Sequence, residues 1–157
     1  MIMRFDDPIA LHSPSRAAPL EKGVRDKLEK ALSVNPEIHF AALVGSRAEG
    51  RANESSDWDI AVLWKQTDAL LRISRHEYLR RELASVIGIS EEKVDLIDLS
   101  NAGLAMRALV AEEGFLLAAN NERSWTKFLE RTWRELEDFY WEKEHFERPA
   151  RFKSCAD

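Results

Sequence analysis

The residues best suited to chemistry in this sequence lie at the two ends of a polar stretch. Gly45 and Ser46 end one apolar run, and after ten intervening residues Asp57 and Asp59 lead into another. In a strand, side chains at i and i+2 share a face about 7 Å apart. Carboxylates this close repel each other, and a divalent cation removes that penalty. The spacing therefore predicts a cation site, and hard oxygen ligands favour Mg²⁺ or Mn²⁺.

A third carboxylate is available further along the chain, in the strand-like run "KVDLIDL" at residues 93 to 99. Asp95 lies between two apolar residues there, and a neighbouring strand would bring it beside Asp57 and Asp59. Strand alternation places Asp98 on the opposite face from Asp95, so only one of the two can face the cation site. We expect that residue to be Asp95, as general base or third metal ligand.

Gly45 and Ser46 have the properties of a phosphate-binding turn. A glycine at a strand end lets the backbone approach a ligand closely, and backbone N–H groups with the Ser46 hydroxyl can hold a phosphate. Arg47 and Arg51 would add positive charge. A lone Gly-Ser or Asp-x-Asp is usually a turn or a helix cap, but a phosphate cradle facing three carboxylates is typical of nucleotidyl transfer.

The elements that must position these residues follow from periodicity and stop signals. Apolar spacing of four predicts a helix from Pro19 to Leu32. Gly and Pro breaks separate the remaining segments. We expect strands "IHFAALVG", "WDIAVLW" and 93–99, with "FLLAA" as a possible fourth. A helix capped by Thr67 or Asp68 should run to about Val86 and stop at Gly88, and another capped by Ser100 or Asn101 should run to about Glu113. The last helix should run from about Glu122 to Glu147, before Pro149.

Helices and strands alternate, so the predicted fold class is α+β, a small mixed sheet covered by helices. Residues 1–18 contain prolines and no periodicity, which indicates an N-terminal arm. Residues 19–121 would form the main domain, and residues 122–157 a C-terminal amphipathic helix and tail.

Composition limits the function classes. The chain has 157 residues, 45% hydrophobic and 32% charged, which is typical of one globular domain. Its apolar runs are too short to span a bilayer, and its first residues lack a secretory pattern. A single cysteine, Cys155, allows no internal disulfide, so we expect a cytoplasmic protein. The net charge of −5 argues against direct nucleic-acid binding.

"GSRAEGRANESSDWDIAV" followed by "KVDLIDLS" resembles the minimal nucleotidyltransferase (MNT) family of the polymerase-beta-like superfamily. The resemblance covers about residues 20 to 120. It implies a nucleotidyltransferase core with an additional C-terminal helix. It also implies ATP as substrate and Mg²⁺ as cofactor, with two Mg²⁺ ions expected and Mn²⁺ as the alternative metal. The implied site residues are Asp57, Asp59 and Asp95 as catalytic residues and metal ligands, and Gly45, Ser46 and Arg47 for the nucleotide.

In size the chain resembles the MntA-type antitoxins of that family, which silence a HEPN-domain RNase toxin by transferring AMP from ATP to a toxin tyrosine. Aminoglycoside adenylyltransferases share the site but carry a sizeable helical domain, whereas only about 35 residues follow the core here. This difference favours a protein acceptor. Two alternatives stay open: an inactive antitoxin that acts by occlusion, and a small-molecule nucleotidyltransferase. The intact set of carboxylates favours the active antitoxin.

Three further segments carry predictions. The last helix has an apolar stripe, part of which we expect to contact another chain. His39, in the first strand, is expected to be a satisfied core or edge residue. Arg72 and His76 are spaced one residue too closely for the Arg-x4-His motif of HEPN ribonucleases, and we expect them on a solvated helix face. The stripe consists of Trp125, Phe128, Leu129, Trp133, Leu136, Phe139 and Tyr140, widened by Trp141 and Phe146.

Overall fold

The computed structural model describes residues 20–153, so the predicted arm at residues 1–18 lies outside it. The described chain forms a four-stranded mixed sheet with helices on both faces, in agreement with the predicted fold class. Its elements, in chain order, are α1 (Lys22–Ser33), β1 (Ile38–Val44), β2 (Trp58–Trp64), α2 (Ala69–Ile87), the short 3-10 helix η2 (Glu91–Lys93), β3 (Val94–Asp98), α3 (Leu104–Glu113), β4 (Phe115–Ala119) and α4 (Glu122–Lys153).

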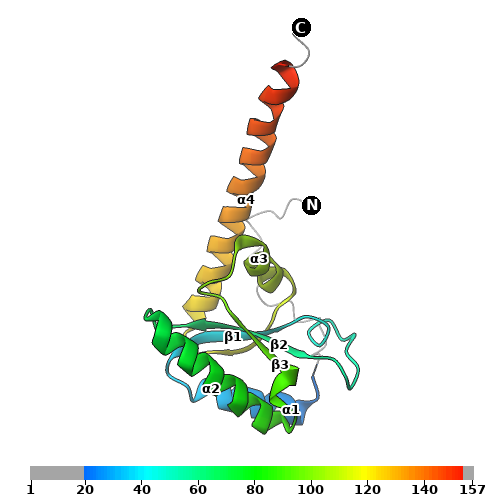
Figure 1. Cartoon of the computed structure of the whole chain (residues 1–157), viewed down its shortest axis with the longest axis vertical. Helices are drawn as coiled ribbons and strands as arrows, with labels where there is room; N and C mark the ends of the chain where they lie inside the picture. Colours follow the sequence, from blue (N-terminus) through cyan, green and yellow to red (C-terminus); the bar gives the residue numbers. More distant parts are fainter. Residues whose placement is uncertain (1–19, 154–157) are drawn as a thin grey trace.

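The strands lie in the order β3-β2-β1-β4. β1 is antiparallel to both β2 and β4, whereas β2 and β3 are parallel, because α2 carries the chain back across the sheet between them. Figure 1 shows α1 and α2 on one side of the sheet and α3 with the first part of α4 on the other. Among the described residues, no helix has the length and apolar character needed to cross a bilayer.

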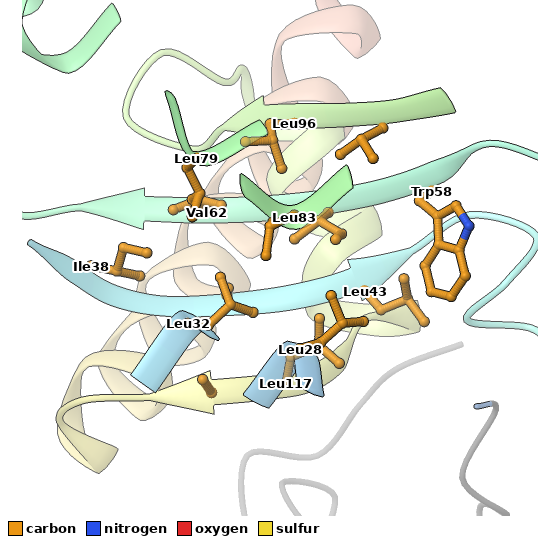
Figure 2. Close-up of a cluster of buried hydrophobic side chains, with 14 of the residues drawn as sticks. Leu28, Leu32, Ile38, Leu43, Trp58, Val62, Leu79, Leu83, Leu96 and Leu117 are labelled. Carbon is orange, nitrogen blue, oxygen red and sulfur yellow. The ribbon is translucent and has the colours of Figure 1, made fainter. Parts of the chain in front are cut away.

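The first core lies between the sheet and the pair α1 and α2. Alternate residues of β2 and β3 point into it, and α1 and α2 contribute leucines that are fully buried. Figure 2 shows these helix leucines among the side chains of the strands. The labelled residues are Leu28, Leu32, Ile38, Leu43, Trp58, Val62, Leu79, Leu83, Leu96 and Leu117.

The second core fills the opposite face and uses the first half of α4. Trp125 packs edge-on against Phe40, with ring centroids 4.9 Å apart, and stacks on Phe128 at 5.7 Å. Leu129 is also buried and Trp133 is packed against the same cluster, so this half of the predicted stripe covers the chain's own sheet.

The second half of α4 projects beyond the sheet, as Figure 1 shows. Phe139, Tyr140, Trp141 and Phe146 are each more than half exposed, and Phe146 reaches 72%. The stripe predicted from sequence is therefore divided: its beginning belongs to the core, and its end presents aromatic side chains to solvent.

Helix boundaries follow the predicted stop signals in part. Asp68 caps α2 by accepting hydrogen bonds from the N–H groups of Leu70 and Leu71, and Gly88 ends it in the left-handed conformation, with φ of 82°. α3, by contrast, starts at Leu104 and has no side-chain cap, so the predicted Ser100 or Asn101 cap is wrong. Residues 98–101 form a turn instead, in which the Ser100 N–H donates to the Asp98 carboxylate.

Two other expectations need correction. α4 does not end before Pro149 but continues to Lys153, since a proline removes one helical hydrogen bond without forbidding the helix. Arg72 and His76 do not lie on a solvated face: Arg72 is only 8% exposed, and His76 joins the Trp64 indole N–H (3.1 Å) to the Leu96 carbonyl (3.0 Å). Their side chains tie α2 to the sheet.

Candidate active site

The site begins where β1 ends and β2 starts. Val44 pairs with Asp59 across the two strands, so the next residue, Gly45, lies beside the Asp59 carboxylate. A Cβ added to Gly45 would lie 2.3 Å from Asp59 Oδ2, and the Gly45 φ of 75° is one that side chains disfavour. Both observations require glycine at this position, because the backbone must turn and must leave room for the carboxylate.

Asp95 joins this corner from the parallel strand β3. Asp59 and Asp95 are register partners, so their side chains leave the same face of neighbouring strands, which run about 4.8 Å apart. Asp57 lies in the loop, one residue before β2, close enough for its charge to act on Asp59, and it is exposed, as is Asp95. The structure thus brings together the three carboxylates that the sequence singled out.

The surroundings of Asp59 disfavour its charge. Burial raises the pKa of the Asp59 carboxyl above its usual value, and the negative charges of Asp95 and Asp57 raise it further. A group in this position gains most from a cation, which would cancel the repulsion among the three carboxylates.

The donor set fits Mg²⁺, since it consists of hard carboxylate oxygens. Within residues 20–153, however, no group of three or more His, Cys, Asp or Glu side chains is arranged to hold a metal ion. The aspartates therefore do not form a closed cage. This openness suits Mg²⁺, which is usually held by one or two carboxylates together with waters and substrate phosphates.

The turn after β1 leaves backbone donors for an anion. The Gly45 carbonyl accepts from the N–H groups of Ala48 (3.1 Å) and Glu49 (3.2 Å), which closes a tight turn. Within the described part of the chain, the backbone N–H groups of Ser46 and Arg47 donate no hydrogen bond. Ser46 is half-buried, so its hydroxyl and these two N–H groups can face a phosphate beside the carboxylates.

Arg47 makes contacts that the sequence did not predict. Its guanidinium donates to the carbonyl oxygens of Ser56 (2.8 Å) and Asn53 (3.2 Å), and it lies over the Trp58 ring, 4.2 Å from the centroid. These contacts hold the loop that carries Asp57. In this structure the Arg47 guanidinium positions the loop. A contact between Arg47 and the nucleotide stays a prediction. Arg51 pairs with Glu49.

Asp98 has a different role from Asp95. It lies on the α2 face, where the Arg72 Nε donates to its carboxylate at 2.8 Å, and both side chains are largely buried. Asn101 accepts from the same guanidinium at 3.3 Å. Asp98 therefore connects β3 to α2 and points away from Asp59.

Sequence reasoning did not nominate Lys93, which lies at the edge of the site. Its ammonium donates to the Ser55 carbonyl at 3.4 Å and so connects the start of β3 to the Asp57 loop. The available signal was its spacing, since Lys93 stands two residues before Asp95.

A family model described as polymerase beta nucleotidyltransferase matches residues 26–123, well over half of the chain. The chain belongs to this nucleotidyltransferase family. The match covers the Gly-Ser turn, Asp57, Asp59 and Asp95, and it ends where α4 begins.

Two relatives are named protein adenylyltransferase MntA. The one from Aphanizomenon flos-aquae is 28% identical over 112 residues, which are 69% of this chain and 75% of that protein. The one from Shewanella oneidensis is 37% identical over 90 residues, 57% of this chain and 60% of that protein. Among nucleotidyltransferases, the chain is therefore similar to the MntA antitoxins.

Solved structures give the same relationship. A chain in a toxin-antitoxin crystal structure with AMP-PNP is 26% identical with a TM-score of 0.60, and the match covers 80% of this chain and 97% of that one. A second similar chain comes from the structure of a tri-AMPylated Shewanella oneidensis HEPN toxin in complex with MNT antitoxin. It is 25% identical with a TM-score of 0.55, and the match covers 81% of this chain and 95% of that one.

Proposed function

We propose that this chain is an antitoxin adenylyltransferase that transfers AMP from ATP to a tyrosine of a partner HEPN toxin. One observation carries the proposal: Asp59 and Asp95 pair on adjacent strands directly beside Gly45, where a Cβ would meet the Asp59 carboxylate. A turn with free N–H groups against clustered carboxylates is suited to a nucleotide triphosphate and its cation. The relatives' names and the AMPylated toxin complex support the choice of AMP and of a toxin acceptor.

The reaction assigns a task to each group. The tyrosine hydroxyl oxygen attacks the α-phosphorus of ATP, the bond from that phosphorus to the β-phosphate oxygen breaks, and pyrophosphate leaves. Asp95, exposed at the strand edge, takes the proton of the hydroxyl. The N–H groups of Ser46 and Arg47 and the Ser46 hydroxyl hold the departing phosphates in line.

Asp57 and Asp59 would hold Mg²⁺, with Asp95 as a further ligand where it does not act as base. When bound, the ion would neutralise charge that develops on the phosphate oxygens. Arg47 acts on this site through the loop, because its bonds to Ser56 and Asn53 fix the position of Asp57.

The projecting half of α4 supports a protein acceptor. Four exposed aromatic side chains on one helix are unusual for a surface that faces only water, and aromatic residues are enriched in interface hot spots. The same observation favours a second candidate, an antitoxin that binds the toxin and blocks it without chemistry.

One experiment tests the proposal and separates the two candidates. The chain and its HEPN toxin are incubated with ATP and Mg²⁺, separated under denaturing conditions, and the toxin is weighed by mass spectrometry. We expect a mass increase of one or more AMP groups on tyrosine, and the refolded toxin should stay inactive. A toxin that is unmodified yet inhibited in the mixture would support occlusion. The Asp59→Asn chain serves as control, since it should bind the toxin without modifying it.

A further inference from the structure

A cleft with basic residues lies on the same face of the sheet as Asp59 but at the other end of β2. It has a volume of about 550 Å³ and is lined by residues of β1, β2, α3 and α4 and of the loops before α3 and α4. Leu63 marks its floor on β2, four residues from Asp59, which is about 13 Å along a strand. The cleft is therefore separate from the transfer site. Its volume lies within the range of small-molecule sites.

The cleft gathers positive charge without enough negative charge to balance it. Arg107, Arg123, Lys127 and Arg131 all line it. Glu135 pairs with two of them, Arg107 at 2.6 Å and Arg131 at 2.9 Å. In the described part of the chain, the side chains of Arg123 and Lys127 have neither an ion pair nor a hydrogen bond.

The positions of these cations are unfavourable for the free protein. Arg123, Lys127 and Arg131 recur every four residues along α4, and like charges at this spacing repel each other. Arg123 is also the second residue of α4, where the positive end of the helix dipole disfavours a cation. An anion in the cleft would reverse both effects, because it would interact favourably with all three charges and with the dipole.

Two buried polar atoms at the cleft point to a ligand independently of the charges. Thr132 is fully buried, lines the cleft, and its Oγ1 has no hydrogen-bond partner. His39 lines the same cleft and its Nδ1 is also unpartnered, contrary to the satisfied histidine expected from sequence. A buried hydroxyl without a hydrogen-bond partner destabilises the folded protein, so a polar ligand that reaches it would gain binding energy.

We propose that this cleft binds a small phosphate-bearing molecule, with the phosphate between Arg123 and Lys127 and a polar group of the same molecule near Thr132 and His39. A small molecule fits better than a macromolecular surface because polar donors from β1, α3 and α4 converge on one concave volume. The site is additional to the proposed transfer reaction and does not depend on it.

Equilibrium dialysis of the full chain with labelled AMP and with inorganic phosphate tests the proposal, in EDTA and at low salt. EDTA removes the divalent cation that the transfer site would use. We expect saturable binding that survives Asp59→Asn. Arg123→Gln and Lys127→Gln should each weaken it about tenfold, as expected for loss of a charge-assisted hydrogen bond. Lys143→Gln, the same change on an exposed part of α4, is the matched control and should leave binding unchanged.

Thr132→Val gives a readout that a purely structural residue would not. It removes an unpaired buried hydroxyl, so the free protein should melt at the same or a higher temperature while AMP binds about threefold more weakly. The proposal is overturned if neither probe binds, if Arg123→Gln and Lys127→Gln bind like Lys143→Gln, or if Asp59→Asn abolishes binding. Loss of toxin binding in the two cleft variants, without any phosphate binding, would overturn it in favour of an acidic protein surface.

Discussion

Asp95 and Asp98 are three residues apart in β3, yet they lie in contrasting surroundings. Asp98 faces α2, is largely buried, and has the Arg72 guanidinium at 2.8 Å. Asp95 faces the other side, is exposed, and has Asp59 as its register partner. Arg72 neutralises the first carboxylate within the fold. Burial raises the pKa of Asp59, and the negative charge of the second carboxylate, Asp95, raises it further. A carboxylate that the protein leaves uncompensated is a better candidate for function than one it neutralises.

The largest effect should come from Asp59→Asn, which keeps the shape of the side chain and removes the charge. We expect the rate of AMP transfer to fall by at least about a hundredfold, because the variant lacks the negative charge that would bind the cation, and the cation would hold the triphosphate. Labelled ATP with the toxin as acceptor measures it. Circular dichroism should show an intact fold. Near-normal transfer would remove Asp59 from the site.

The next prediction separates the two aspartates of β3 directly. Asp95→Asn should lower transfer about a hundredfold, as expected for loss of a general base. Asp98→Asn should leave transfer nearly unchanged, since its side chain points toward α2. The two variants are matched in chemistry and strand. If Asp98→Asn abolished transfer and Asp95→Asn did not, the assignment of faces would be wrong.

Arg72→Met tests the structural half of the comparison. It keeps the apolar stem of the side chain but leaves Asp98 without its cation, and breaking a buried pair costs about 3–5 kcal/mol. Since Asp98 is partly accessible, we expect about 2–3 kcal/mol, measured by urea unfolding. Arg75→Met, at an exposed ion pair of the same helix, should cost under about 1 kcal/mol. Equal costs for the two variants would show that the Arg72 pair contributes little.

The smallest expected effect is on folding stability, which the repulsion and burial of the Asp59 carboxylate lower. The folded protein binds the Asp59 proton more tightly than the unfolded chain does, because the pKa of Asp59 is raised. The contribution of this group to stability therefore falls as pH rises from the ordinary aspartate value through the raised one. Asp59→Asn should lack this fall and melt a few degrees higher at neutral pH, by calorimetry. Adding Mg²⁺ should raise the melting temperature of the native chain more than that of the variant.

The arrangement of the sheet residues could be predicted because strand alternation is a local rule. The sequence alone assigned Asp57, Asp59 and Asp95 to one face and Asp98 to the other, and the structure confirms that Asp59 and Asp95 are register partners. The Asp68 cap and the Gly88 stop of α2 were predictable for the same reason, since capping depends on neighbours in the chain. The failed caps at Ser100 and Asn101 show the limit of this reasoning. The Asn101 side chain accepts from Arg72, which lies 29 positions away along the chain, and the Ser100 backbone N–H donates to Asp98 in a turn.

Sequence by itself determined the fold class, the family resemblance and the choice of candidate carboxylates, because each depends on residue type and short spacing. Only the tertiary structure decided which polar residues are already neutralised. It placed Arg72 on Asp98, turned Arg47 onto the loop carbonyls, and left His39 and Thr132 without partners in a cleft of basic residues. It also divided the α4 stripe at the edge of the sheet, because the core ends there while the helix continues. These outcomes depend on contacts between distant segments, which no local pattern specifies.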